Sequence, residues 1–342
     1  MITPSLIPAL TAVPGLSGHE DAIARVMADH LAPLVNDVTI DALGNVIARM
    51  GPARPPRIVV AAHIDTVGFL VKQVRAGMIG VVSVGGVNLK ALPGSPVQIG
   101  PGIPGMITVR SQHLASPGEH ITTIEDIFIQ VDPAALDQVE ITQPVLYASQ
   151  PVELGEHLYC SPYLDNRAGC AVMLALAQTL YEQPPANEVI LIGTVQEETT
   201  CMGAYHALAA VQPDAALFVD GTLAYDTPET QGRGPVRLGA GPVLTAFLYM
   251  SSLTGWHAHP GLRAHLKHIA QQYGIPVQQD AIRGLMNDVR AALPLGIPSA
   301  LIGLPVCGKH APLETVHMGD LELATRLLAA TLQSPLPSLS RG

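Results

Sequence analysis

The stretch Arg57-Ile58-Val59-Val60-Ala61-Ala62-His63-Ile64-Asp65 is a short apolar run that ends in two polar, chemically active side chains. A run of this kind predicts a strand that is buried on both faces of a sheet. Similar runs occur at Glu188 to Val195, Ala215 to Val219 and Ser299 to Leu304. Segments with helical spacing lie between them, at Ala168 to Tyr181 and Pro260 to Gly274. This alternation predicts an α/β fold with an open, mostly parallel sheet flanked by helices.

Two further segments add to the predicted fold. Ile23 to Val35 has helical spacing and follows the start signal Ser17-Gly18-His19-Glu20, so it predicts an amphipathic first helix. Residues 71–157 are rich in Gly, Pro and Val/Ile pairs, with little helical periodicity. We therefore expect residues 71–157 to form an inserted small β-barrel domain, and residues 1–70 and 158–342 to form one catalytic α/β domain.

Composition excludes several classes of protein. Of 342 residues, 48% are hydrophobic and 13% charged, so the chain can bury a sizeable core. Its formal net charge is −10 and its Lys and Arg residues do not cluster, which argues against nucleic acid as a partner. No run reaches the roughly 18 apolar residues of a membrane span, and no secretory signal is recognisable. We expect a cytoplasmic protein without a membrane partner.

The cysteines limit the kind of metal site that the chain can build. Cys160, Cys170, Cys201 and Cys307 lie far apart and form no CxxC pair. This usage indicates reduced thiols rather than disulfides or a thiolate zinc site. Any metal ion must therefore be held by His, Asp and Glu side chains.

Candidate ligands follow the ends of the predicted strands, where open α/β sheets form their binding crevices. They are His63 and Asp65, Asp165 at the start of a predicted helix, the adjacent Glu197 and Glu198, Asp220, and His310 in the loop after the last strand. In an extended segment His63 and Asp65 face the same way, so Asp65 can accept the second ring N–H of a metal-binding His63. Glu197 and Glu198 point in opposite directions, so one can bind metal while the other acts as general base.

Each of these residues has a simpler interpretation when it is taken alone. Asp165 could cap its helix, the two glutamates could form a solvated pair, and His310 could lie on the surface. His317 and Asp226 are the alternatives to His310 and Asp220, whereas His257 and His259 are expected to be loop residues. The complete set of His and carboxylate ligands without cysteine favours a site for a pair of zinc-like ions.

At these residues the sequence resembles the tetrahedral aminopeptidases and glutamyl aminopeptidases, a family of co-catalytic zinc peptidases. The resemblance runs nearly end to end, and the order and spacing of its motifs make it specific. The motifs are Pro14-Gly15-Leu16-Ser17-Gly18-His19-Glu20, Leu43-Gly44-Asn45-Val46-Ile47, Ala62-His63-Ile64-Asp65 with Gly68-Phe69, Leu164-Asp165-Asn166-Arg167, Gln196-Glu197-Glu198, Asp220 with Asp226-Thr227-Pro228, and His310 followed by Ala-Pro-Leu-Glu314.

The resemblance implies a zinc-exopeptidase-like fold and a role for each candidate residue. His63 and Asp220 would bind one metal ion, Glu198 and His310 the other, and Asp165 would bridge both. Glu197 would be the general base and Asp65 the partner of His63. The ions would be two divalent cations, with zinc expected first and cobalt or manganese as alternatives.

The resemblance also implies the reaction and the assembly. The enzyme would remove N-terminal residues from short peptides, and the inserted module would shape the entrance and join subunits into a homo-oligomer such as a dodecamer. Two segments depart from the family pattern, Thr199 to Met202 and Asn287 to Arg290. These departures affect substrate preference more than reaction type. The competing hypotheses are a dinuclear amidohydrolase that deacylates small N-acyl compounds, and a catalytically silent paralogue that acts as a binding protein.

Overall fold

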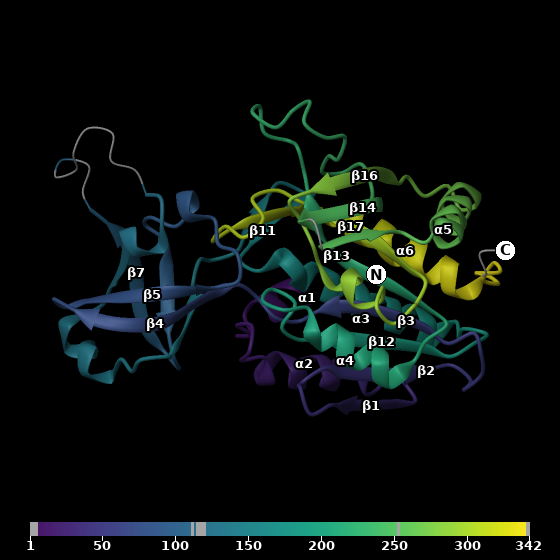
Figure 1. Cartoon of the computed structure of the whole chain (residues 1–342), viewed down its shortest axis with the longest axis horizontal. Helices are drawn as coiled ribbons and strands as arrows, with labels where there is room; N and C mark the ends of the chain where they lie inside the picture. The colour runs from purple at the N-terminus through teal and green to yellow at the C-terminus, as the bar shows by residue number, and fades with distance from the viewer. Residues whose placement is uncertain (1–5, 111–112, 114–120, 252–253, 340–342) are drawn as a thin grey trace.

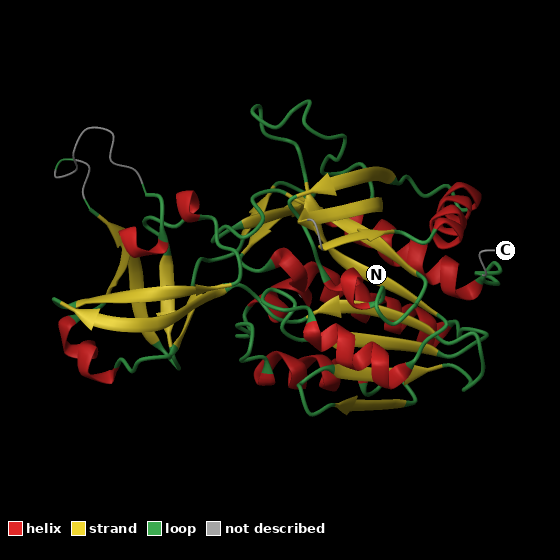
Figure 2. Cartoon of the chain, viewed as in Figure 1, coloured by secondary structure: helices red, strands yellow, loops and turns green. Residues whose placement is uncertain are grey.

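The computed structural model of the chain describes residues 6–110, 113, 121–251 and 254–339. It consists of a large α/β lobe and a smaller β lobe that projects from one side of it (Figure 1). Figure 2 shows that helices gather on the large lobe, whereas the small lobe is mostly strand. Within the described residues, no helix is both long and apolar enough to cross a bilayer.

The main sheet of the large lobe runs in the order β1-β2-β12-β3-β13-β17-β14-β15, and β16 pairs with β14. Its central strands β12, β3, β13 and β17 are parallel to one another, whereas β2 and β14 pair antiparallel at either side of them. The strand bounds are β1 (Asp37–Ile40), β2 (Val46–Met50), β3 (Ile58–His63), β12 (Val189–Thr194), β13 (Ala215–Leu223), β14 (Val243–Ser251), β15 (Thr254–His257), β16 (Gln278–Arg283) and β17 (Ser299–Val306).

Helices cover both faces of this sheet, which explains why its central strands are apolar throughout. In β3, Val60 and Ala62 pack into the core under one helical layer, while Val59 and Ala61 pack into the core under the other. The first layer contains α1 (Leu6–Thr11), α2 (Asp21–Leu31), α3 (Leu164–Glu182), α5 (Pro260–Gln272) and α6 (Met318–Gln333). The second contains α4 (Met202–Val211) and the 3-10 helix η4 (Asp288–Ala291).

The small lobe is a closed barrel with strand order β4-β5-β8-β7-β6-β9. Its interior is filled by side chains that include Phe69, Val71, Ile79 and Ile129. The barrel elements are β4 (Gly68–Arg75), β5 (Met78–Val84), β6 (Pro96–Ile99), β7 (Ile103–Val109), β8 (Ile127–Gln130) and β9 (Pro144–Tyr147), with the 3-10 helices η1 (Leu89–Ala91), η2 (Ile124–Asp126) and η3 (Pro133–Gln138) between them.

A small third sheet joins the chain leaving the barrel to the large lobe. In it β11 (Leu158–Ser161) lies between β10 (Val152–Leu154) and β18 (Glu314–His317). The barrel strands thus run from Gly68 to Tyr147, and β10, within the predicted insert of 71–157, pairs outside the barrel. The division into an inserted domain and a split catalytic domain is our proposal, and part of the insert, residues 111–112 and 114–120, lies outside the described residues.

The predicted fold class is confirmed by this architecture, an α/β fold with parallel strands at the centre of its sheet, flanking helices and an inserted barrel. The helix predicted at Ile23 to Val35 is α2, which spans Asp21–Leu31 and is preceded by α1, so it is not the first helix and it ends before Val35. Cys160, Cys170, Cys201 and Cys307 are all free, as their spacing predicted.

Candidate metal centre

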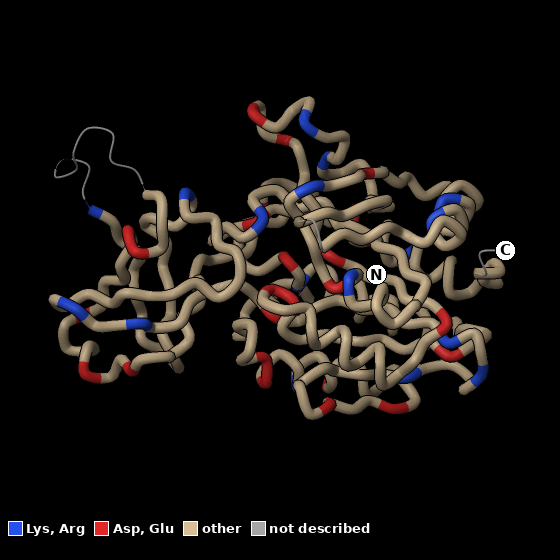
Figure 3. Tube along the Cα trace, in the orientation of Figure 1, with Lys and Arg blue, Asp and Glu red and all other residues tan. Residues whose placement is uncertain are grey.

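The predicted ligands converge where the parallel strands end. His63 is the last residue of β3, Glu197 and Glu198 follow β12, Asp220 lies within β13, and His310 lies in the loop after β17. Asp165 enters from the start of α3. Figure 3 shows acidic positions near the middle of the molecule, on the side of the large lobe that faces the barrel.

One group of ligands combines His63, Asp165 and Asp220, whose ligand atoms all lie within 4.8 Å of one another. His63 Nε2 lies 3.3 Å from Asp220 Oδ1 and 3.5 Å from Asp165 Oδ1. All three side chains are buried. One imidazole nitrogen and two carboxylates form a donor set that suits a zinc-like divalent ion.

A second group combines Asp165, Glu198 and His310. His310 Nε2 lies 3.2 Å from Asp165 Oδ2 and 3.4 Å from Glu198 Oε2. Asp165 therefore directs one carboxylate oxygen toward each group. This geometry is what a carboxylate shared by two neighbouring cations requires.

The polar atoms of both groups also show that the residues fit metal ions. His63 Nε2, Asp165 Oδ1, Asp220 Oδ1 and Glu198 Oε1 are buried and make no hydrogen bond within the described part of the chain. Buried polar atoms without a partner are costly, because they lose water and gain nothing in exchange. Divalent cations would satisfy all four atoms at once.

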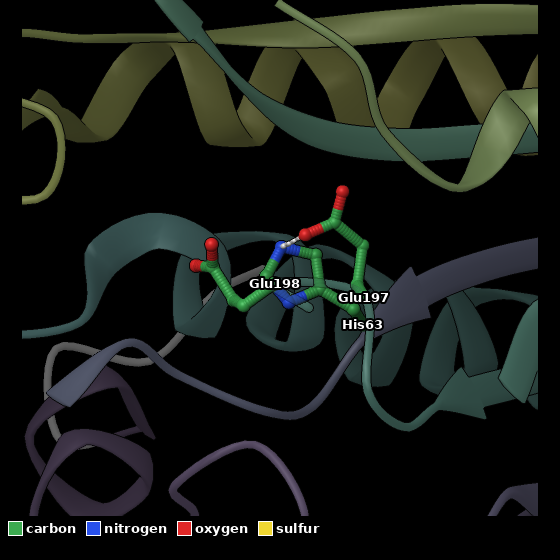
Figure 4. A group of neighbouring side chains, drawn as sticks. All are labelled: His63, Glu197 and Glu198. Carbon is green, nitrogen blue, oxygen red and sulfur yellow. Dashed lines mark ion pairs between the residues drawn. The ribbon is translucent and has the colours of Figure 1, made fainter. Parts of the chain in front are cut away.

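The Glu197 side chain also lies at this centre, on the side of His63 opposite Glu198. Its Oε2 lies 3.8 Å from His63 Nε2, and Figure 4 shows the Glu197 and Glu198 carboxylates on either side of the imidazole ring. Burial raises the pKa of Glu197 well above its usual value; the nearby His63 lowers it, and Asp220 raises it further. A carboxylate whose pKa is raised is suited to accept and return a proton.

Asp65 is fully buried and connects His63 to the segment that carries the glutamates. Its Oδ1 and Oδ2 accept the backbone N–H groups of Glu197 and Glu198, each at 3.0 Å. His63 Nδ1 lies 3.4 Å from Asp65 Oδ1 and 3.2 Å from the Asp65 carbonyl oxygen. Asp65 thus lies beside the imidazole, with its carbonyl oxygen at hydrogen-bond distance from Nδ1, and its carboxylate holds Glu197 and Glu198 by their backbone.

Glu314 has a similar positioning function on the opposite side of the centre. Its Oε2 accepts the N–H of Asp165 at 2.7 Å, and its Oε1 accepts the N–H of His310 at 2.5 Å. One buried carboxylate therefore fixes the backbone of two candidate ligands that are far apart in the sequence. Burial and the negative charge of Asp165 together raise the pKa of Glu314 to about 8.

The concentration of carboxylates shifts the other ionisable groups at the centre. Burial lowers the pKa of His63, but Glu197 and Asp220 outweigh this effect and raise it well above its usual value. Burial raises the pKa of Asp165, but the neighbouring Lys309 and the two histidines bring it well below its usual value. The centre therefore favours bound positive charge.

Lys309 is a cation at the centre that the sequence interpretation missed. Its ammonium group forms an ion pair with Asp165 Oδ2 and donates a hydrogen bond to the Gly221 carbonyl oxygen at 3.1 Å. Burial lowers the pKa of Lys309, but Asp165 and the surrounding carboxylates raise it above its usual value. The only sequence signal was its position directly before His310.

Arg167 stabilises the backbone just after the end of β3. It is 1% exposed; one guanidinium nitrogen donates to the Ile64 carbonyl oxygen, and Nη2 donates to the Val13 carbonyl oxygen at 3.1 Å. Gly15 leaves room for this side chain, because a Cβ at Gly15 would lie 2.5 Å from Nη2. Arg167 thereby fixes the peptide between His63 and Asp65.

At three positions near the candidate ligands, the backbone adopts a left-handed conformation that residues other than glycine rarely adopt. Tyr163, Gln196 and His310 have φ values of 64°, 58° and 64°. Each lies at or within two residues of Asp165, Glu197 or the His310 ligand itself. Such conformations cost free energy and are concentrated at functional sites.

The barrel contributes a glycine turn to the rim of the centre. A Cβ added at Gly85 would lie 3.2 Å from Glu198 Cβ, and one at Gly86 would lie 3.2 Å from His310 Nδ1. The Asn88 N–H donates to the His310 carbonyl oxygen at 3.2 Å. This turn after β5 lies against Glu198 and His310, two of the three ligands of the second group, and larger residues would crowd them.

The simpler interpretation of Asp165 as a helix cap is wrong. Tyr163 occupies the N-cap position of α3 without a side-chain bond, and Asn166 Oδ1 accepts the Gly169 N–H at 3.0 Å instead. The alternative ligands also lie elsewhere. His317 Nδ1 accepts the Gly319 N–H at 3.1 Å, and Asp226 Oδ2 accepts the Leu238 N–H at 3.1 Å.

The two segments that depart from the family pattern lie beside Glu197. Cys201 is buried with its Sγ 3.9 Å from Glu197 Oε1. In η4, Asp288 is buried and accepts a hydrogen bond from Thr194 at 2.5 Å, whereas Arg290 is exposed. These segments therefore line the surroundings of the candidate base and leave the ligand set unchanged.

A helix-flanked sheet with His and carboxylate ligands at the ends of its parallel strands is the arrangement of a metal-dependent peptidase. Comparison with known proteins identifies the family. The family model of the M42 glutamyl aminopeptidases matches residues 44–327, and the chain belongs to this family. It is a metal-dependent aminopeptidase, a hydrolase of peptide bonds.

Relatives cover almost the whole chain. The protein SgcX of Escherichia coli (strain K12) is 32% identical, over 92% of this chain and 89% of its own length. The structure of aminopeptidase APDkam598 from Desulfurococcus kamchatkensis has a TM-score of 0.90 at 27% identity and covers 97% of this chain and 94% of its own. The Pyrococcus horikoshii TET1 peptidase, which assembles into a tetrahedron or an octahedral shell, has a TM-score of 0.84 at 25% identity, covering 96% and 98%.

Proposed function

We propose that this aminopeptidase uses two divalent cations, one held by His63 and Asp220, the other by Glu198 and His310, with Asp165 shared between them. The observation that carries the proposal is the pair of ligand groups that meet at Asp165, each with a separate carboxylate oxygen of that residue. Imidazole and carboxylate donors without a thiolate suit zinc first, with cobalt and manganese as alternatives.

The bound ions supply Lewis acidity, which polarises the scissile carbonyl group and acidifies a water molecule. Glu197 then accepts the proton of that water and returns it to the leaving amine. Glu197 lies outside the two groups that share Asp165, although its carboxylate also lies within 4.8 Å of ligand atoms of His63 and Glu198. Its raised pKa supports the role of base rather than ligand. Asp65 keeps Glu197 and Glu198 in place through their backbone N–H groups.

We further propose that the substrates are short peptides with a free N-terminus, and that the protein acts in the cytoplasm as a homo-oligomer. Cations and carboxylates at the centre can recognise a free α-amino group, which restricts cleavage to chain ends. The glycine turn at Gly85 and Gly86 supports a role for the barrel at the entrance. Assembly into a dodecamer is supported by the related structure of PhTET1-12s, which is a dodecamer.

The test is a panel of aminoacyl anilides and N-acetyl amino acids, assayed with protein that has been stripped of metal and reloaded separately with Zn, Co or Mn. We expect hydrolysis of the aminoacyl anilides only, restored by metal. Metal content measured on the same samples should reach two ions per chain at full activity. Turnover of N-acetyl amino acids would instead support a deacylase, and metal binding without any turnover would support a binding protein.

A further inference from the structure

Lys309 lies where a second cation would bind. Its side chain is 11% exposed and its ammonium group contacts Asp165 Oδ2, the oxygen that also lies 3.2 Å from His310 Nε2. Within the part of the chain that the structure describes, no other lysine or arginine forms an ion pair with the candidate ligands. Lys309 is therefore the internal countercharge of the cluster.

The two ligand groups are not equivalent with respect to Lys309. Asp165 Oδ1 faces His63 and Asp220, whereas Oδ2 faces His310 and also contacts Lys309. An ion bound at the His310 group would need Asp165 Oδ2, the oxygen that the Lys309 ammonium group contacts. A metal ion and an ammonium group on one carboxylate oxygen repel each other. An ion at the His63 group uses the other oxygen and meets no such competition.

A lysine in this place can also move away. Its ammonium group sits on a flexible four-carbon stem, and it has a second acceptor in the Gly221 carbonyl oxygen at 3.1 Å. It can therefore release Asp165 while it keeps the bond to Gly221. A residue without a positive charge could not make this exchange.

We propose that Lys309 is a positioning residue that holds Asp165 in the metal-free protein and makes the two ions bind in order. The first ion binds at His63, Asp165 and Asp220, and the second binds at Asp165, Glu198 and His310 only after the ammonium group withdraws. This inference rests on the two-ion function proposed above. It concerns how the site is loaded, which the ligand set alone does not determine.

The test is an equilibrium titration of the metal-stripped full chain with Zn²⁺ against a competing chelator, and with Co²⁺ followed by its absorption spectrum. The wild type should bind two ions in separate steps. Lys309→Met should tighten the second step by about 10 to 100-fold, the range found when groups next to a ligand are altered, and leave the first step unchanged. Lys309→Arg, which keeps the charge, should retain the separation, and Lys267→Met on α5 should behave as the wild type.

A second measurement tests the inference even if Lys309→Met folds poorly. In EDTA, Lys309→Met and Lys309→Gln should melt at a lower temperature than the wild type, because the carboxylates lose their countercharge, and added Zn²⁺ should close this gap. If Lys309→Met leaves the second binding step unchanged, the inference is wrong while the two-ion function stands. If neither the wild type nor Lys309→Met binds more than one ion per chain, the two-ion function fails and this inference fails with it.

Discussion

At the scale of single residues, the neighbours Glu197 and Glu198 should respond differently to the same substitution. Glu197→Gln should keep both ions, because the ligands are untouched, while kcat falls by about 10² to 10⁴-fold, the usual contribution of a general base. Glu198→Gln should weaken a ligand and lower occupancy of one site. Metal analysis and single-turnover kinetics of both variants distinguish the roles. Loss of an ion from Glu197→Gln alone would show that they are reversed.

Glu314 should matter for metal affinity although it binds no ion. It accepts the N–H groups of both Asp165 and His310, so Glu314→Ala frees the backbone of two ligands at once. We expect metal affinity to fall by about 10 to 100-fold, as for other groups that orient ligands. Chelator competition measures this change. Glu322→Ala, on the exposed face of α6, is the control, and equal affinities for the two variants would contradict the assigned role.

The sequence indicated which side chains meet but not what surrounds them. The candidate ligands were recognisable because a polar residue at or shortly after the end of a buried strand needs a reason, as His63 and Glu198 show. Lys309 and Asp65 were harder. A lysine in a polar loop normally faces water, and nothing in the sequence reveals that Asp65 accepts two N–H groups from residues more than a hundred positions away. The catalytic and ligand roles stay predictions until the variants are measured.

At the scale of elements, α4 must begin without a side chain at its second residue. A Cβ at Gly203 would lie 2.1 Å from the Val195 carbonyl oxygen, so α4 and the end of β12 could not keep their positions. Gly203→Ala should lower the free energy of unfolding by about 1 to 3 kcal/mol, as overpacked cores do. Urea denaturation measures this loss. At the matching position of α5, the nearest atom to a Cβ at Gly261 would be in the His259 ring, at 3.3 Å, so Gly261→Ala should change stability by less than ~1 kcal/mol. Equal losses would rule out the packing argument.

The start of α2 should make stability depend on pH. Glu20 Oε1 accepts the N–H groups of Gly18 and Gln196, and burial raises the pKa of Glu20 to about 7 although the Gly18 bond lowers it. In the unfolded chain Glu20 loses its proton near pH 4.5. The stabilisation of the folded protein by protonated Glu20 is therefore fully present below that pH and is lost as pH rises through about 7.

Glu20→Gln keeps the acceptor oxygen and removes the titration. Measured in EDTA, the melting temperature of the wild type relative to Glu20→Gln should therefore fall between about pH 5 and pH 8. Glu322→Gln, an exposed change on α6, should show no such trend. A difference that is the same at both pH values would mean that Glu20 is not the source.

The elements themselves were predictable where burial alone determines them. The central strands β3, β12, β13 and β17 are apolar on both faces because helices cover both, and this pattern is visible in the sequence. Helix α1 has six residues, too few for a periodic pattern, and was missed. Strand β10 was placed in the insert because composition cannot show that it pairs with β11.

At the scale of the whole molecule, the barrel should join subunits. It exposes apolar side chains that include Val74 at 43%, Val82 at 42% and Met106 at 43%, which a subunit contact would bury. We expect the wild type to be an oligomer by light scattering at micromolar concentration. Val82→Lys or Met106→Lys should shift it toward smaller species, whereas Ile40→Lys on β1 of the large lobe should not. A monomeric wild type would contradict this prediction.

The insertion of the barrel between His63 and Asp165, and the wide separation of His63 and His310 in the sequence, have a consequence for biosynthesis. A ribosome adds about 5 to 20 residues per second, so roughly 10 to 50 s separate the synthesis of His63 from that of His310. During this interval the nascent polypeptide lacks one of the ligands proposed above. The proposed two-ion centre therefore cannot be complete before the segment that carries His310 has been synthesised.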